Sequence, residues 1–107
     1  MDVLIEIGNS DDKLSQIDWS GFCDEVSEEL LLASTQVYGV WYSIPNSAYQ
    51  NAAWHVNLSG PYVKSVKQEL RHIAHKYNQD SIAWSETPVT VFLKGEKRDV
   101  VNSNPSM

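Results

Sequence analysis

The sequence predicts a two-layer α+β domain whose elements follow the order strand, helix, strand, strand, helix, strand. Short stretches in which every second residue is apolar predict the strands, and two longer stretches with apolar residues every three to five positions predict the helices. The length of 107 residues fits one domain, because a chain of this size buries one sheet face under two helices.

The first strand and the first helix are predicted near the N-terminus. Residues 3–7 alternate in the manner of a strand, and the turn-forming residues 8–12 end it. Ser15 and Asp18 have the spacing of a capping box, and Asp18 alone is an equally suitable cap, so we predict a helix at about 17–34. The apolar face of this helix is predicted to consist of Ile17, Phe22, Val26, Leu30 and Ala33.

Two strands of a hairpin are predicted to follow this helix. Residues 37–43 are rich in β-branched and aromatic side chains, which favour strands. Residues 52–58 form a second such stretch, and Pro45 begins the turn-forming residues between the two. In the second strand we expect Trp54 to face the core and His55 to face outward.

The second helix has the most regular apolar pattern of the chain. Pro61 suits the first position of a helix, so we predict that this helix covers about 61–78, with Asn78 as its stop. The residues of its apolar stripe are Val63, Val66, Leu70, Ile73, Ala74 and Tyr77.

The C-terminal part contains two further strand-like stretches. They cover 81–85 and 89–93, and Pro88 lies between them, so they form either one bent strand or two short ones. Apolar periodicity ends there. We therefore expect one domain at 1–94 and a disordered tail at 95–107.

This order of elements is typical of the ferredoxin-like fold, a βαββαβ sandwich in which both helices cover one face of an antiparallel sheet. Another α+β sandwich with a different strand order is the alternative. In the ferredoxin-like arrangement the second face of the sheet stays open.

Composition and charge exclude several functional classes. The net charge is −6, which argues against binding to a nucleic-acid backbone. Cys23 is the only cysteine, so the chain has no internal disulfide. The sequence contains no secretory signal and no apolar stretch of about 20 residues, so we expect a cytoplasmic protein that does not insert into a membrane.

Catalytic and metal-binding patterns are also missing from the sequence. A cysteine nucleophile needs a lowered pKa, and the acidic neighbours of Cys23 have the opposite effect. His72 and His75 lie three residues apart on the predicted second helix, but no third metal ligand accompanies them. The adjacent Asp11 and Asp12 are a weak signal for a divalent cation. We therefore expect no catalytic residue, no metal and no cofactor, and a protein that is not an enzyme.

The open face of the predicted sheet carries aromatic side chains. If the alternation is regular, Tyr38, Tyr42 and His55 lie there together. Such a face stacks RNA bases in some proteins, but the RNP motif is missing and the net charge has the wrong sign. Because partly apolar sheet faces are rarely left uncovered, we expect these residues to form an interface and the protein to be a homo-oligomer.

The two predicted helices carry opposite charges. The acidic residues of the first helix are Asp24, Glu25, Glu28 and Glu29, and the basic residues of the second are Lys64, Lys67, Arg71 and Lys76. These charges either complement each other across neighbouring helices or make the second helix a docking surface. Exposed pairs would stabilise the fold by only about 0–1 kcal/mol each.

Two short segments resemble sequences of a known group. Residues 7–14 (IGNSDDKL) and 79–84 (QDSIAW) are similar to segments of small, uncharacterised proteins of tailed bacteriophages, and the similarity extends to about residue 93. The group has no assigned activity, so the resemblance implies no catalytic residues. It implies a phage accessory protein that acts in the cytoplasm of the host.

These two segments also supply the predicted binding site. One follows the first strand and the other precedes the last, and in an antiparallel sheet these two ends lie at the same side. A cluster of short polar groups beside a tryptophan suits a small polar ligand that contains an aromatic ring. The predicted ligand-binding residues are Asn9, Ser10, Asp11, Lys13, Asp80, Ser81 and Trp84.

The sequence thus favours a non-enzymatic phage protein that sequesters a nucleotide-like small molecule and in this way counters host defence. The alternative is an inhibitor or adaptor that binds a host defence protein. In that case the acidic first helix or the aromatic sheet face would form the contact.

Overall fold

The computed structural model describes residues 1–9, 13–45, 47–86 and 93–97 of the chain. The elements follow the predicted order. Along the chain they are β1 (Asp2–Gly8), α1 (Gln16–Ala33), β2 (Ser34–Tyr42), β3 (Asn51–Leu58), α2 (Gly60–Lys76) and β4 (Ala83–Glu86). Neither of these helices is long and apolar enough to cross a lipid bilayer.

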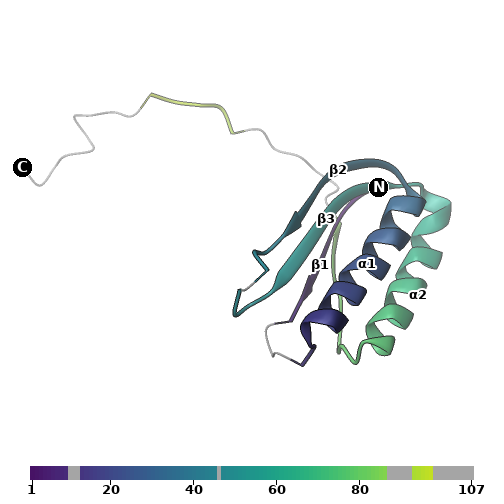
Figure 1. Ribbon diagram of the computed structural model, residues 1–107. Coiled ribbons are helices and arrows are strands. Elements are labelled where there is room, and N and C mark those ends of the chain that lie inside the picture. The colour runs from purple at the N-terminus through teal and green to yellow at the C-terminus, as the bar shows by residue number, and fades with distance from the viewer. Residues whose placement is uncertain (10–12, 46, 87–92, 98–107) are drawn as a thin grey trace, which may run out of the picture.

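The four strands form one antiparallel sheet in the order β2-β3-β1-β4. The two helices lie side by side on one face of this sheet (Figure 1). The arrangement is the two-layer ferredoxin-like sandwich that the element order predicts, with β1 and β3 in the interior and β2 and β4 at the edges. The alternative strand order is excluded.

The hydrophobic core lies between the sheet and the helices. Alternate residues of β1 and β3 point into it, and among them Val3, Ile5 and Trp54 are fully buried. The apolar stripe of α2 packs against the same layer, as predicted, with Val66 and Leu70 buried. The charged side chains of both helices consequently face outward or toward the neighbouring helix.

α1 begins close to the predicted residue, but one residue of its buried face differs from the prediction. The hydroxyl of Ser15 accepts a hydrogen bond from the amide of Asp18 at 3.2 Å, so Ser15 is the N-cap. Ile17, which we predicted in the core, is 84% exposed, and Trp19 is buried instead. A helix turns by about 100° per residue, so Ile17 lies about 140° from Phe22 whereas Trp19 lies about 60° from it. The prediction for Ile17 is therefore wrong.

β2 follows α1 without a loop. Ser34 is both the C-cap of α1 and the first residue of β2, so the strand begins earlier than the predicted residue 37. Every residue of β2 after Ser34 is exposed. The reason is visible in Figure 1, where β2 lies at the edge of the sheet.

The connection from α2 to β4 is short. Asn78 has a φ of 56°, a left-handed conformation that commonly ends helices, which confirms its predicted role as a stop. The predicted bend at Pro88 and most of the predicted stretch at 89–93 lie outside the described residues. Residues 93–97 are in neither helix nor strand, and 98–107 of the predicted tail are not described.

Candidate ligand-binding groove

A groove of about 430 Å³ lies between α2 and the segment that leads into β4, and we call it the α2–β4 groove. Its polar lining residues are Lys67, Arg71, His75, Gln79, Asp80 and Ser81, and its apolar ones are Leu70, Ala74, Ile82 and Trp84. The volume lies within the range of small-molecule sites, which is about 300–1,000 Å³.

One side of α2 gives the groove a row of basic side chains. Lys67, Arg71 and His75 are spaced by four residues, so they project from the same side of the helix. Arg71 is exposed and forms no ion pair with any described residue. A shallower hollow of about 500 Å³ adjoins the groove and shares Lys67 and Arg71 with it. On a chain with a net charge of −6, this side of α2 is a local basic surface.

Trp84 forms an aromatic wall of the groove. It stands opposite the core residue Ile5 in the sheet, so its half-buried side chain points to the helix side. Lys67 Nζ lies 5.0 Å from the centroid of a Trp84 ring, and Trp84 Nε1 donates to Glu86 Oε1 at 3.2 Å. The same Glu86 oxygen lies 3.6 Å from Lys67 Nζ. These contacts fix the tryptophan beside the basic row.

The two segments of the predicted binding site approach each other at one described pair of residues. Lys13 Nζ and Asp80 Oδ2 are 4.0 Å apart, so the connection after β1 lies beside the connection before β4. The groove is lined by Asp80, Ser81 and Trp84. Lys13 does not line it but forms an ion pair with Asp80. The remaining predicted residues Ser10 and Asp11 lie outside the described part of the chain.

Asn9 has a place inside the protein and does not line the groove. Its side chain is 1% exposed, and its amide nitrogen donates to Leu14 O at 3.0 Å and to Gln50 Oε1 at 3.2 Å. Its side-chain oxygen accepts a hydrogen bond from the Leu14 amide at 3.0 Å. Gln50 in turn exchanges hydrogen bonds with Gln16 at 2.9 and 3.1 Å. These bonds hold the connection after β1 against the hairpin of β2 and β3. The polar side-chain atoms of Asn9 therefore form hydrogen bonds within the protein.

The basic wall of the groove is absent from the predicted ligand-binding residues. We placed Lys67 and Arg71 on a charged helix surface, and His75 among residues without a functional role. The four-residue spacing of all three side chains was the available signal. The sequence could not predict that Trp84 lies beside these three residues, because β4 and α2 come together only in the tertiary fold.

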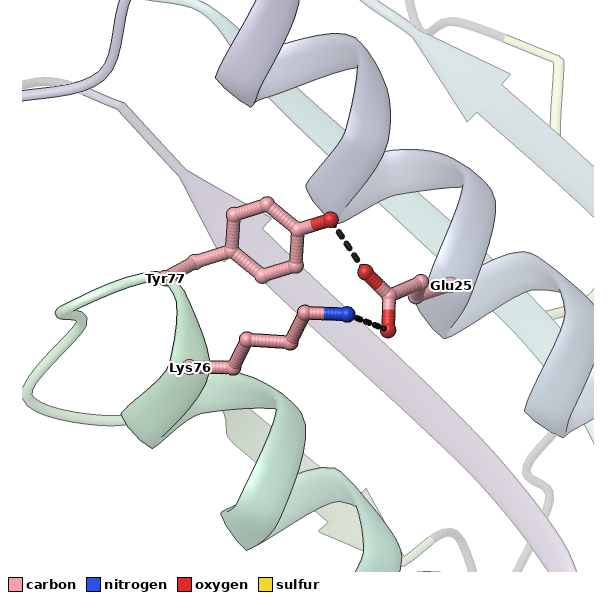
Figure 2. A network of polar contacts seen from close by, with 3 residues as sticks. All are labelled: Glu25, Lys76 and Tyr77. Carbon is pink, nitrogen blue, oxygen red and sulfur yellow. Dashed lines mark hydrogen bonds and ion pairs between the residues drawn. The ribbon is translucent and has the colours of Figure 1, made fainter.

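The predicted charge complementarity between the helices is present at the C-terminal end of α2. Figure 2 shows Glu25 of α1 facing Lys76 and Tyr77. Lys76 Nζ donates to one carboxylate oxygen at 3.0 Å, and the Tyr77 hydroxyl donates to the other. The hydrogen bonds from Tyr77 and Lys76 lower the pKa of Glu25, and the bond to Glu25 raises the pKa of Tyr77 to about 12.

The open face of the sheet brings Tyr38 and His55 together, as predicted. Their ring centroids are 4.7 Å apart, and the Tyr38 hydroxyl donates to Asp2 Oδ1 at 2.9 Å. Asn57 Nδ2 donates to the same oxygen at 2.8 Å. The bonds from Asn57 and Tyr38 lower the pKa of Asp2. Polar contacts within the chain therefore occupy part of this face.

Tyr42 lies on the helix side of the sheet, contrary to the prediction. β2 has a bulge between Val37 and Gly39, and one extra residue in a strand reverses the alternation beyond it. Tyr42 consequently packs edge-on against the core residue Trp54, with ring centroids 5.8 Å apart. Trp41 takes its place on the open face. The glycine inside the strand was the available signal, since glycine often marks a bulge.

The nucleophile and metal candidates have ordinary structural surroundings. Cys23 is buried in α1, and burial together with Asp24 raises the pKa of its thiol to about 12, so it is not a nucleophile at neutral pH. His72 Nδ1 lies 3.9 Å from Glu69 of the same helix. Within the described residues, no three His, Cys, Asp or Glu side chains are placed to hold a metal ion.

No protein-family model matches the sequence, and no curated protein matches it at a significant level. The function is therefore inferred from the shape, the charges and the aromatic wall of the α2–β4 groove.

Proposed function

We propose that the protein is a non-enzymatic binding protein that holds a small anionic molecule with an aromatic ring, such as a nucleotide, in the α2–β4 groove. One observation carries this proposal. Lys67, Arg71 and His75 line a groove of about 430 Å³ whose wall includes the half-buried ring of Trp84. Positive charge next to an aromatic ring is the combination that recognises a phosphate and a base together.

Each part of such a ligand has a matching group. A phosphate is bound by Arg71, whose planar guanidinium is not engaged by any described carboxylate and suits two parallel hydrogen bonds. On either side of it, Lys67 contributes a further positive charge and His75 a further ring nitrogen for hydrogen bonding. The base stacks on Trp84, while Asp80 and Ser81 accept and donate hydrogen bonds at the polar rim.

Cys23, the cysteine considered as a nucleophile, does not line the α2–β4 groove. The thiol of Cys23 is buried in α1, and its raised pKa keeps it protonated at neutral pH. The resemblance to phage proteins gives this activity a context, because the similar segment 79–84 is one wall of the groove. We therefore propose that the protein withdraws a nucleotide-like signal on which a host defence depends.

Isothermal titration calorimetry with purified nucleotides, including cyclic and linear forms, tests the proposal. We expect binding to the wild type and about a tenfold loss of affinity in Arg71→Gln, corresponding to about 1.4 kcal/mol. The matched control is Lys64→Gln, which removes the same charge from the same helix but does not line the α2–β4 groove. The affinity of this control should change by less than about threefold, because Lys64 lines the adjoining hollow and not the groove itself.

Two results would count against the groove. One is the absence of heat and of a small-molecule adduct in native mass spectrometry of protein taken from defence-bearing cells. The other is an equal loss of affinity in Arg71→Gln and Lys64→Gln, since this would indicate attraction by the whole basic surface. A Trp84→Leu variant adds an aromatic readout, because nucleotide binding should quench the fluorescence of wild type more than that of the variant.

A protein partner at α1 is the second candidate function. Burial and the neighbouring carboxylates of Glu69 and Glu28 raise the pKa of Glu29, so negative charge is crowded on this side of the helices. A basic surface of a host protein would relieve this crowding. Pull-down of a host protein that survives Arg71→Gln but is lost in the double variant Glu28→Lys and Glu29→Lys would favour this function over the groove.

A further inference from the structure

The two edges of the sheet differ in a way that affects association. β4 has four residues and ends with the charged Glu86. β2 has nine residues, STQVYGVWY, and contains neither a charged residue nor a proline. Natural proteins usually protect an edge strand by shortness, charge or proline, because its free backbone groups pair with other chains. β4 is protected in this way, whereas the composition of β2 provides no such protection.

The C-terminal half of β2 is the regular part of this edge. Both irregularities of its pairing with β3 lie between residue 34 and residue 39. From Gly39 to Tyr42 the pairing is continuous, and Val40, Trp41 and Tyr42 are 40%, 56% and 50% exposed. Large apolar side chains are therefore exposed on both faces of the same short stretch.

The direction of the free backbone groups follows from the neighbouring hydrogen bond. The amide of Ser43 donates to Asn51 O across the hairpin at 2.9 Å, so it points toward β3. Amides of successive residues in a strand point to opposite sides. The amides of Tyr42 and Val40 therefore point away from β3, toward an edge that no described strand covers.

We infer that β2 pairs with the β2 strand of a second copy of the protein, antiparallel and about a two-fold axis, so that the two sheets join into one of eight strands. In this arrangement Val40 and Tyr42 of each copy lie beside those of the other on the helix side, and the Trp41 rings do so on the open face. The pairing leaves the α2–β4 groove accessible, because the groove is lined by Trp84 of β4, and β4 lies at the opposite edge of the sheet from β2.

Charge favours a second copy over a foreign strand. In a two-fold antiparallel pair each strand faces its own sequence, so a charge close to the axis would lie near the same charge of the other copy, which destabilises a strand pair. β2 has none, although the chain as a whole has a net charge of −6. A second copy of the protein is just as acidic as the first, so the two copies can approach closely only through an uncharged surface. The uncharged strand β2 provides such a surface.

Sedimentation velocity of the full chain over a range of concentrations tests the pairing. We expect a monomer–dimer equilibrium that Tyr42→Lys weakens by about tenfold or more, because the two-fold axis brings the new charge in twice. The matched control is Tyr62→Lys, the same change at a tyrosine that is 58% exposed and lies on α2 rather than in the sheet. This control should leave the dimer constant within about threefold. Trp41→Lys repeats the test if Tyr42→Lys proves unstable, because Trp41 lies on the open face and pairs with Ala53 rather than with Trp54.

Amide hydrogen exchange of the wild type distinguishes edge pairing from association through the open face. We expect the amides of Val40 and Tyr42 to be protected above the dimerisation concentration and to lose at least about tenfold of this protection below it. A dimer in which these amides exchange freely would overturn the inference, since the contact would lie elsewhere. A monomer at all concentrations, or protection that does not depend on concentration, would overturn it as well.

Discussion

Gly21 and Tyr77 show how one missing side chain permits a contact between the helices. A Cβ atom at position 21 would come within 2.8 Å of the Tyr77 hydroxyl, which is closer than ordinary van der Waals contact. The hydroxyl lies there because it donates to Glu25 on the next turn of α1. The ring of Tyr77 also packs on Phe22 at 5.3 Å between centroids. Gly21 is therefore explained by the space it leaves rather than by its backbone conformation.

We expect Gly21→Ala to change stability little in the wild type but to stabilise the Tyr77→Phe variant by about 1 kcal/mol, the usual gain from replacing glycine in a helix. In the wild type this gain is offset, because the methyl group displaces the hydroxyl from Glu25 and a hydrogen bond of about 1 kcal/mol is lost. Urea unfolding of the four proteins measures the difference. An equal gain in both backgrounds would contradict the crowding at position 21.

The same contact predicts a dependence of stability on pH. Glu25 has a lowered pKa, so its contribution is present above its usual pKa of 4.5 and is lost as the pH falls through the lowered value. The pKa of Tyr77 is raised from 10.0 to about 12, so its contribution is present below pH 10.0 and is lost as the pH rises toward 12. Between these limits the contact is fully formed.

We expect Tyr77→Phe to lower the melting temperature at pH 7 and to make the decline between pH 10 and 12 shallower than in the wild type. The reason is that the variant has no hydroxyl to ionise. Thermal unfolding followed by circular dichroism measures the profile, with Tyr62→Phe as control because Tyr62 is exposed and has no part in this contact. Parallel profiles for Tyr77→Phe and the wild type would show that other groups control the alkaline limit.

Elements with a strong apolar period were predictable, and elements with local irregularities were not. The buried faces of α2, β1 and β3 could be predicted from the spacing of their apolar residues. Each of these elements packs against the core along its whole length, so the spacing stays regular from end to end. β2 has no such constraint, since both of its faces are exposed, and its bulge moved Tyr42 to the helix side. The prediction for Ile17 was wrong for another reason, because its five-residue spacing from Phe22 places it on a different side of the helix.

The connection after β1 is held by Asn9, and this predicts a loss of stability when its side chain is shortened. Asn9→Ala would leave the buried amide and carbonyl of Leu14 without their partners, which costs about 1–3 kcal/mol for each unpaired buried group. We expect a total loss of about 2–6 kcal/mol, with Gln16→Ala losing less because its contact to Gln50 is only partly buried. Chemical denaturation measures both.

This variant also separates structure from ligand binding. At temperatures where Asn9→Ala is still folded, its nucleotide affinity should stay close to that of the wild type, because Asn9 does not line the groove. If Asn9→Ala lost as much affinity as Arg71→Gln while its secondary structure stayed unchanged, Asn9 would belong to the binding site after all.

On the scale of the whole molecule, the sequence predicted the neighbourhood of the candidate site but not its composition. The approach of the two similar segments follows from the antiparallel order of β1 and β4, and Lys13 and Asp80 meet accordingly. The basic row of α2 was not included, because only the tertiary fold brings Arg71 of α2 and Trp84 of β4 into the lining of one groove. A groove formed by distant segments leaves no local pattern in a sequence, whereas a strand or helix does.

The net charge of −6 connects the two proposals and gives them opposite responses to salt. Two acidic copies repel each other as they approach, so added salt screens the repulsion and should tighten the pairing of the uncharged β2 strands. An anionic ligand is attracted to Lys67 and Arg71, so the same salt should weaken its binding in the groove. We expect a several-fold change in each constant, in opposite directions, between about 0.05 and about 0.5 M sodium chloride. Sedimentation and titration on one preparation measure both. Nucleotide binding that strengthens with salt would refute the basic groove. A dimer that dissociates with salt would refute a neutral edge contact and would indicate association through opposite charges.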